Sequence, residues 1–266
     1  MLEYEFMRTA FVAGGIAAVV AGAVGFFLVL RNSIFAGHAL SHVGFAGAAG
    51  SVLIGLSPFW GLLALTLVAG VVIGALGERL RGRDVAVGII LSLALGLGVL
   101  FLYLYTRYAT QAIALLFGNI LGVGRDTLWD LLTLGILALT ALAAISRPLL
   151  FATLEPELAE AKGVSLRLIS VLFMAIVAVA VAETAQVVGI LLVFALMVGP
   201  AAAALRLSSG LGRGIVLAVA LALLETWLGI ALAYATDWPT TSWIVFLSCA
   251  VYFLSLVRPA ASPDCA

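Results

Sequence analysis

Apolar runs of about twenty residues recur along the whole chain, and they constrain the fold more than any other feature. A helix needs about twenty apolar residues to cross the roughly 30 Å hydrocarbon core of a bilayer, whereas membrane barrels show shorter alternating segments. Hydrophobic residues make up 65% of the chain and charged residues 10%, against about a quarter charged in soluble domains. The sequence therefore predicts an all-α fold, a polytopic bundle of transmembrane helices.

Charged or turn-rich breaks divide the chain into nine candidate spans. They are 10–30, 34–56, 59–77, 85–106, 127–146, 167–184, 187–206, 214–236 and 240–257. A further run, 111–121, is too short to cross and is expected to be re-entrant or interfacial. The break between 184 and 187 is weak, because only Glu183, Thr184 and Gln186 mark it. Eight or nine crossings are therefore both consistent with the sequence.

The basic residues indicate the orientation, because cytoplasmic loops carry an excess of Lys and Arg. With the N-terminus outside, only Arg8, Arg107 and Arg125 of the 13 basic residues lie outside. The cytoplasmic ones are Arg31, Arg79, Arg81, Arg83, Arg147, Lys162, Arg167, Arg206, Arg213 and Arg258. We predict one transmembrane domain over 1–258 and a tail over 259–266, with the N-terminus outside and the C-terminus in the cytoplasm.

The only long cytoplasmic loop, 147–167, contains the pattern of a short helix over 156–162. Pro156 stands near the first helical position, acidic residues occupy the first turn, Lys162 lies in the last turn and Gly163 follows as a stop. Two interpretations remain open: an ordinary surface helix, or a docking element that a cytoplasmic partner grips.

Both histidines of the chain lie within one helical turn, in the segment GHALSH. His38 and His42 are four residues apart, so a helix places them on one face, close enough to share a divalent cation. Small residues form a neighbouring stripe that permits close approach of a second helix. They are Gly37, Ser41, Gly44 and Ala48. The alternative is a pair of histidines that only cap or hydrogen-bond within the bundle.

Two carboxyl groups inside predicted spans could complete a metal site. Two imidazoles still leave a metal such as Zn²⁺ in need of further ligands. Glu225 lies about halfway along its span and is the first candidate, because a carboxylate inside a bundle requires a cation, a proton or a donor. Glu183 is the weaker candidate, because it lies near the outer end of its span and could simply reach water.

The chain lacks an energy source of its own. A phosphate-binding loop of the form GxxxxGK[ST] requires a lysine, and the sole lysine, Lys162, stands in EAKGV. No catalytic serine, cysteine or metal-hydrolase motif is visible. We therefore expect that this chain does not hydrolyse ATP and is not an enzyme, and we expect no nucleic-acid partner.

Several segments in chain order resemble the membrane permeases of zinc and manganese ATP-binding-cassette importers. The first, 6–50, contains an arginine-ended apolar run, the GHALSH segment and a Gly-rich stretch. Later segments resemble further blocks of the family: LFGNILGV (116–123), EPELAEAKGV (155–164), VVGILLVFALMVGPAAAALRLS (187–208) and DWPTTSWIVFLS (237–248). The resemblance covers nearly the whole chain, and the set of motifs is specific.

The resemblance implies a bacterial inner-membrane permease that pairs with a second copy of itself. Its other partners would be a cytoplasmic ATPase dimer and an extracytoplasmic metal-binding protein. It also implies that the cytoplasmic loop holds the coupling helix, for which the candidate residues are Glu155, Pro156, Glu157, Leu158, Ala161 and Gly163. The transported ion would be the only bound ion, with no permanent cofactor.

The double histidine departs from the family pattern. Many members have an aspartate at the position of His38, paired with the histidine that matches His42. More nitrogen and less carboxylate favours Zn²⁺ over Mn²⁺ by ligand softness. Two alternatives remain open: an ion- or proton-coupled secondary transporter that uses Glu183 and Glu225 as a relay, and a siderophore or cobalamin importer permease of similar architecture.

Overall fold

The computed structural model describes residues 4–77, 83–104, 116, 118 and 120–257, and all regular structure in them is helical. The elements are α1 (Glu5–Leu30), α2 (Ile34–Leu53), α3 (Pro58–Leu76), α4 (Arg83–Leu104), the 3₁₀ turn η2 (Ile120–Gly122), α6 (Arg125–Leu154), α7 (Pro156–Ala161), α8 (Leu166–Val188), α9 (Ile190–Leu207), α10 (Leu211–Thr236) and α11 (Thr240–Val257). The predicted all-α class is confirmed.

Among the described residues, eight helices are long and apolar enough to cross a membrane. They are α1, α3, α4, α6, α8, α9, α10 and α11. The ninth long helix, α2, has 20 residues and contains no Asp, Glu, Lys or Arg. It falls short in hydropathy because His38, His42 and several glycines and serines replace aliphatic residues. The helix that bears both histidines is thus the one long described helix that is not among these eight.

The break between α8 and α9 does not lie where the polar residues suggested. Glu183 and Gln186 belong to α8, which continues to Val188. Gly189 makes the break, with φ of +87°, a backbone conformation that favours glycine. The prediction that the span 167–184 ends near 184 was wrong, because buried polar residues inside a helix resemble a loop in sequence. Most of the predicted re-entrant run, 111–121, and the whole tail, 259–266, lie outside the described residues.

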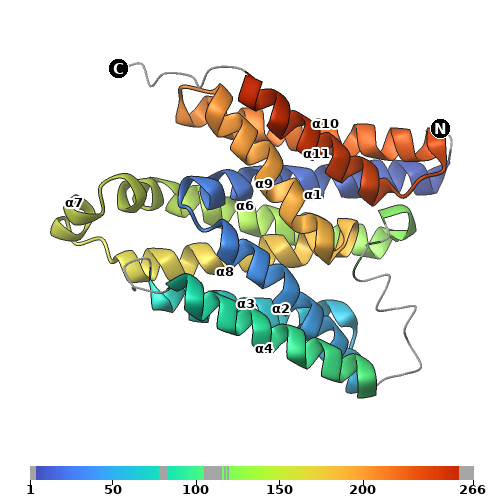
Figure 1. Cartoon of the computed structure of the whole chain (residues 1–266), viewed down its shortest axis with the longest axis horizontal. Helices are drawn as coiled ribbons and strands as arrows, with labels where there is room; N and C mark the ends of the chain where they lie inside the picture. Colours follow the sequence, from blue (N-terminus) through green and yellow to red (C-terminus); the bar gives the residue numbers. More distant parts are fainter. Residues whose placement is uncertain (1–3, 78–82, 105–115, 117, 119, 258–266) are drawn as a thin grey trace.

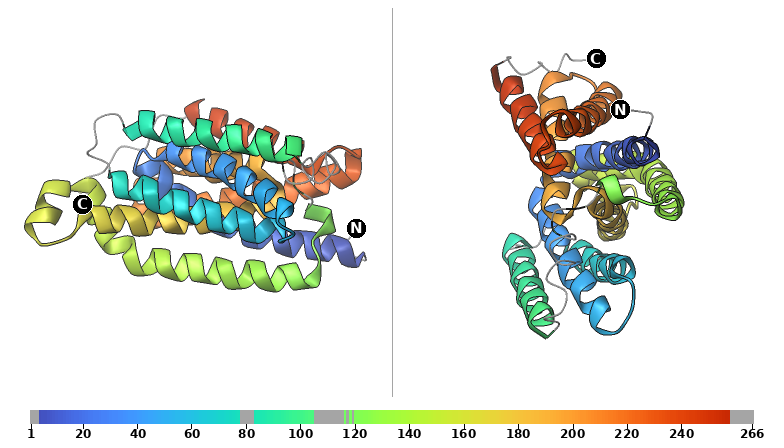
Figure 2. Two further views of the ribbon diagram at one scale, coloured as in Figure 1. Left: turned by 90° about the horizontal axis from the view of Figure 1, so that it is seen from below. Right: turned by 90° about the vertical axis from the view of Figure 1, so that its right-hand side faces the viewer.

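Helix α1 is the central helix of the bundle (Figures 1 and 2). It packs against α6, α8, α9 and α10, and most of it is buried. The end-on view in Figure 2 places α1 between the group α2–α4 on one side and α10–α11 on the other. The histidine-bearing α2 packs mainly on α3 and α4, with further contacts to α8 and α9.

Glycines allow the helices around α2 to approach closely. A Cβ on Gly47 would lie 2.3 Å from the carbonyl oxygen of Gly61 on α3, and a Cβ on Gly61 would lie 2.2 Å from that of Gly47. Gly44 packs against Thr66 and Leu62 of the same helix. Of the predicted small-residue stripe, Gly44 receives α3, whereas Gly37 faces Leu28 of α1; Gly47, which is not part of the predicted stripe, makes the closest approach to α3.

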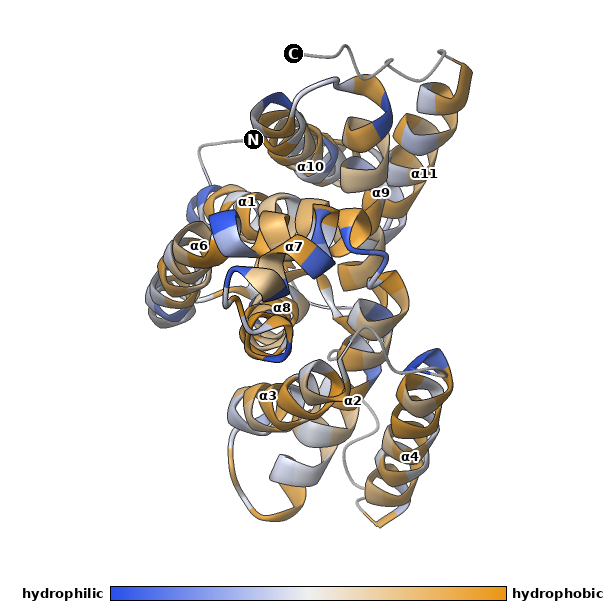
Figure 3. Cartoon of the chain, turned by 90° about the vertical axis from the view of Figure 1, so that its left-hand side faces the viewer, coloured by the Kyte–Doolittle hydropathy of each residue, from blue (hydrophilic) through white to orange (hydrophobic). Residues whose placement is uncertain are grey.

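The short helix α7 lies at the end of the bundle opposite to the start of α1 (Figure 1). Figure 3 views the molecule from the α7 end and shows hydrophilic residues on α7 and on the neighbouring helix ends, against predominantly hydrophobic helices. The start of α1 and the connection that contains α7 are therefore on opposite sides of the bundle, in agreement with the relative placement that the basic residues predict. The predicted loop is shorter than 147–167, because α6 continues to Leu154 and α8 begins at Leu166.

Candidate functional site

His38 and His42 contact each other on one face of α2. Their ring centroids are 4.8 Å apart and the rings are nearly perpendicular, at 82°. Both side chains are only partly buried, whereas Gly37, Ser41 and Gly44 beside them are buried. Nδ1 of His38 is buried without a hydrogen-bond partner. Two adjacent imidazoles with a free ring nitrogen can bind one divalent cation, because the neutral imidazole nitrogen is a good ligand for such ions.

The histidine pair lies deeper in the bundle than its position in α2 suggests. His38 is the fifth residue of α2, but its ring packs against Phe194 of α9, with centroids 4.9 Å apart. Phe194 is itself only five residues into α9, which starts at the opposite end of the bundle from α2. Five residues of helix span about 7 Å. The two rings therefore meet where α2 and α9 pack against each other, within about two turns of the start of each helix.

The structure does not bring Glu225 to the histidine pair. Glu225 is fully buried on α10, and α10 packs against α1, α9 and α11. Ser248 of α11 lies near Glu225, but its hydroxyl donates to the carbonyl of Ala195 at 3.0 Å. No group of three His, Cys, Asp or Glu side chains that could hold a metal forms within the described residues. In this conformation α9 stands between the pair and the carboxyl group.

Glu183 is also away from the pair, and it does not reach water. Its side chain on α8 is fully buried, and neither carboxyl oxygen has a hydrogen-bond partner. It faces Gly135 of α6, where a Cβ would lie 3.0 Å from Oε1 of Glu183. The interpretation that Glu183 is a solvated residue near a helix end was wrong, because α8 continues beyond it to Val188 and the neighbouring helices cover it.

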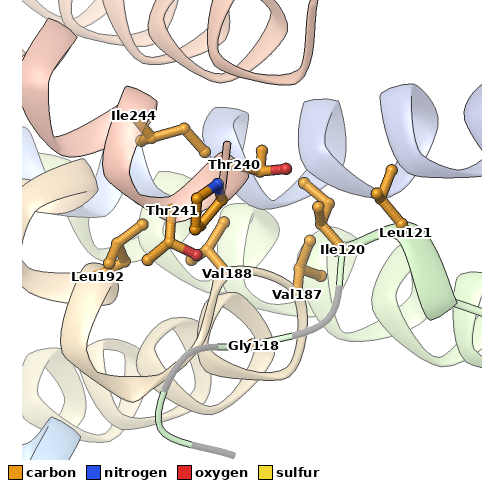
Figure 4. A pocket seen from close by; sticks show the side chains of 10 residues that line it. Gly118, Ile120, Leu121, Val187, Val188, Leu192, Thr240, Thr241 and Ile244 are labelled. Atoms are coloured by element: carbon orange, nitrogen blue, oxygen red, sulfur yellow. The ribbon is translucent and has the colours of Figure 1, made fainter. Parts of the chain in front are cut away.

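A small cavity opens at the end of α8 (Figure 4). Its volume is about 180 Å³, and it lies between η2, Val187 and Val188 of α8, and the first residues of α11. Apolar side chains form most of its wall, and the hydroxyls of Thr240 and Thr241 supply polar atoms (Figure 4). The cavity lies at the end of the molecule opposite to α7, so it marks an opening on that side.

The short helix α7 forms nearly as predicted, over Pro156–Ala161 with Lys162 as its C-cap. It ends in a Schellman motif: the N–H of Val164 donates to the Ala159 carbonyl at 2.9 Å, and the N–H of Gly163 donates to the Glu160 carbonyl at 2.9 Å. Gly163 has φ of +83°, which explains the glycine. Buried Ala159 anchors the helix to the bundle.

The remaining surface of α7 is available to a partner. All six candidate coupling residues are exposed: Glu155, Pro156, Glu157, Leu158, Ala161 and Gly163. Leu158 is a large apolar side chain with 47% of its surface exposed. A protruding helix with an exposed leucine among acidic residues has the features of an interface that another protein covers.

Sequence reasoning used Arg31 only for orientation and missed its structural role. Arg31 is buried at the end of α1, and its Nη1 donates to the Leu149 carbonyl at 3.4 Å and to the Thr153 hydroxyl at 3.0 Å. Its guanidinium lies 5.4 Å from the ring centre of Phe173 on α8. The available signal in the sequence was the position of the charged Arg31 at the end of the first apolar run. Phe194, the ring against His38, gave no signal in the sequence.

Together, these features define a multi-pass membrane protein with ionisable groups in its interior and a structured helix at one end, as in transport permeases. A family model described as "ABC 3 transport family" matches residues 3–259. The chain belongs to this family.

Relatives and solved structures agree with this membership. The chain is 31% identical over 253 residues to the manganese import system permease protein ScaB of Streptococcus parasanguinis, covering 95% of this chain and 90% of ScaB. It is 33% identical over 235 residues to a probable metal transport system membrane protein of Treponema pallidum, covering 88% of each. PsaBC from Streptococcus pneumoniae in complex with Fab matches with a TM-score of 0.86 and 27% identity, over 98% of this chain and 94% of the PsaBC chain.

Proposed function

We propose that this chain is the permease subunit of an ATP-driven importer of a divalent first-row transition metal. The observation that carries the proposal is the contact between His38 and His42, 4.8 Å apart inside a family member whose named relatives move metal. The pair supplies two nitrogens and leaves coordination positions open. An incomplete site suits a transporter, because a closed tetrahedral cage would retain the ion.

The identity of the ion draws on two arguments that point in different directions. Ligand softness favours Zn²⁺ at a site with two imidazoles. ScaB and other named relatives are manganese systems, and they give a zinc preference no support. The proposed cargo is therefore the class of divalent transition ions, and the order of Zn²⁺ and Mn²⁺ is a question for direct competition.

The proposal includes a separate ATPase dimer that docks on α7, a second copy of the permease, and an extracytoplasmic metal-binding protein. Helix α7 has a fixed start at Pro156 and a Schellman stop at Gly163, and its exposed Leu158 points away from the bundle. Gly163→Pro or Leu158→Glu should uncouple ATP hydrolysis from uptake while the permease still inserts. Normal coupled uptake in both variants would move the docking site elsewhere.

The test of the function is uptake of radioactive Mn²⁺ and Zn²⁺ into proteoliposomes that contain the permease with its ATPase. We expect uptake of both ions to require ATP. We also expect Mn²⁺ to inhibit the uptake of Zn²⁺, and Zn²⁺ to inhibit the uptake of Mn²⁺. Uptake that proceeds without ATP and follows an imposed proton gradient would instead support the alternative of a secondary transporter.

The proposed location is the bacterial inner membrane, with the N-terminus outside and α7 in the cytoplasm. The asymmetry of basic residues supports this orientation. In a background without native cysteines, an impermeant maleimide should label Arg125→Cys from outside and spare Gly82→Cys. The reverse labelling would invert the orientation.

A further inference from the structure

A second cavity lies at the α7 end of the bundle, and it shares no lining residue with the cavity in Figure 4. Its volume is about 590 Å³, and its wall comes from the ends of α1, α3 and α6, from α7, and from the first turns of α8. Figure 3 looks onto this end of the molecule, where α7 lies next to the ends of α6 and α8. Five helices therefore border a space that the described side chains leave open.

The charged residues of this cavity wall are mostly basic. Arg31 at the end of α1 is buried, with 7% of its surface exposed, and Arg167 in the first turn of α8 is exposed. Glu160 of α7 is the one acidic residue of the described wall, and it is exposed to solvent. Two arginines and one glutamate give the wall a formal charge of +1. Guanidinium groups bind phosphate oxygens well, because their planar donors match the geometry of such anions.

Ser170 adds a hydroxyl group that the protein itself leaves unused. This residue lines the cavity with 2% of its surface exposed, and its Oγ has no hydrogen-bond partner among the described residues. The hydroxyl of Thr153 in the same wall, in contrast, donates to the Leu149 carbonyl at 2.6 Å. Arg167 and Ser170 are three residues apart on α8 and so share a face of that helix. A buried hydroxyl without a partner is unfavourable, so an acceptor that enters the cavity would satisfy it.

The rest of the cavity wall is largely apolar, and this favours a ligand with both a charged and an apolar part. The apolar lining residues are Ala75, Leu76, Ala152 and Leu166. An anionic phospholipid presents a phosphate group beside its glycerol and acyl carbons. Anionic lipids are abundant in the cytoplasmic leaflet, and basic pockets between helices on that side bind lipid headgroups. The cavity lies on that side in the proposed orientation, in which α7 faces the cytoplasm.

We propose that this cavity binds a phosphate group through Arg31, Arg167 and Ser170, and that an anionic phospholipid of the cytoplasmic leaflet supplies it. A free phosphate ion offers the same charge and acceptors, so the two sources are separated by experiment. Neither a transported metal nor ATP takes part in the site. Only its placement in the cytoplasmic leaflet rests on the proposed function. Pro156, the first residue of α7, also lines the cavity, so a bound headgroup lies against the start of that helix.

The experiment is titration of water-soluble short-chain phosphatidylglycerol into the delipidated full-length chain in neutral detergent, without metal or ATP, followed by calorimetry. The wild type should bind it saturably. Arg167→Gln should weaken binding roughly fivefold, and Ser170→Ala should weaken it about threefold or more. Both variants should keep the wild-type melting temperature without lipid, because Arg167 is exposed and the Ser170 hydroxyl makes no bond to lose. Arg213→Gln is the matched control, since this exposed arginine lies on α10 outside the cavity.

Short-chain phosphatidylcholine and inorganic phosphate are the comparison ligands. Phosphatidylcholine should bind more weakly, because its choline cancels the phosphate charge, and equal binding of the two lipids would overturn an anion site. Wild-type affinity for phosphatidylglycerol in both Arg167→Gln and Ser170→Ala would overturn the site as well. If inorganic phosphate binds with the same sensitivity to the two variants and phosphatidylglycerol does not bind, the phosphate site stands and the lipid source is overturned. Metal uptake is not a readout here, so a failure of the proposed function would leave these results unchanged.

Discussion

The two faces of α2 differ in how tightly they pack against neighbouring helices. On one side, Gly44 and Gly47 receive α3 so closely that backbone nearly meets backbone. On the other, His38 and His42 are half-buried and contact each other and Phe194. The packed side fixes where α2 lies, and the histidine side leaves ring nitrogens available. Substitutions on the two sides should therefore fail in different ways, one in folding and the other in transport.

The largest effect is expected on the packed side. Gly47→Val places side-chain atoms where the carbonyl of Gly61 lies, at 2.3 Å from the position of the new Cβ. The helices must separate, and overpacking of this kind costs about 1–3 kcal/mol or more. We expect a lower melting temperature and a loss of monodisperse protein on size exclusion. Gly96→Val on α4 is the control, because a Cβ at that position would have nothing within 4 Å. An equal loss of melting temperature in both variants would contradict the special role of the glycine face of α2.

Removal of one imidazole should leave the fold intact and reduce transport. We expect His42→Ala to lower metal uptake by at least about tenfold, because a two-nitrogen site loses half of its ligands. Its melting temperature should match the wild type. Ser41→Ala is the control in the same turn, since Ser41 only donates to the Gly37 carbonyl of its own helix. Unchanged uptake in both His42→Ala and His38→Ala would falsify the histidine site.

Acidification should act on the histidine side alone. Imidazole binds a metal only when it is neutral, and its ordinary pKa is about 6.5. Uptake should therefore be full at pH 7.5 and should fall as the pH drops below about 6.5 and the imidazoles become protonated. Thermal stability, which the glycine side controls, should change little over this range. ATPase activity measured in parallel distinguishes an effect of pH on the partner ATPase from an effect on the histidine pair. Uptake that does not change with pH would contradict imidazole ligands.

The smallest effect is expected from exchanging one ligand for another. His38→Asp restores the residue that the family resemblance implies at this position, and it replaces a nitrogen donor by a harder oxygen donor. Uptake should be retained, and the ratio of Mn²⁺ to Zn²⁺ transport should rise by a few-fold. Competition between the two ions in proteoliposomes measures this ratio. No change in the ratio would mean that His38 does not contact the ion.

The sequence predicted features that depend on local chemistry. The long apolar runs, the glycine stop at Gly163 and the i, i+4 spacing of His38 and His42 each follow from neighbouring residues, and the structure contains all three. The local signal misled at Glu183, because a polar residue inside a buried helix looks the same in sequence as one at a break. The actual break lies at Gly189, which has a positive φ, and the sequence analysis did not predict a break at this residue.

Contacts between distant segments were beyond the reach of the sequence. Phe194 is 156 residues from His38, and no spacing rule connects them. The same holds for Gly135 opposite Glu183 and for α9 between the histidine pair and Glu225. Crossing angles and tilts decide these neighbours, and they arise from the packing of many side chains at once. A single sequence shows which residues are unusual inside a membrane but not which of them meet.

The central position of α1 affects how the chain must be made. This helix is synthesised before the other described helices, yet its most extensive contacts are with α10, which begins at Leu211. At about 5–20 residues per second, roughly ten to forty seconds separate the end of α1 from the start of α10. During that interval α1 stands in lipid without its main partner. The segment from Thr9 to Leu30 contains no charged residue. Helix α1 can therefore remain in the bilayer as a single span until the later helices pack against it.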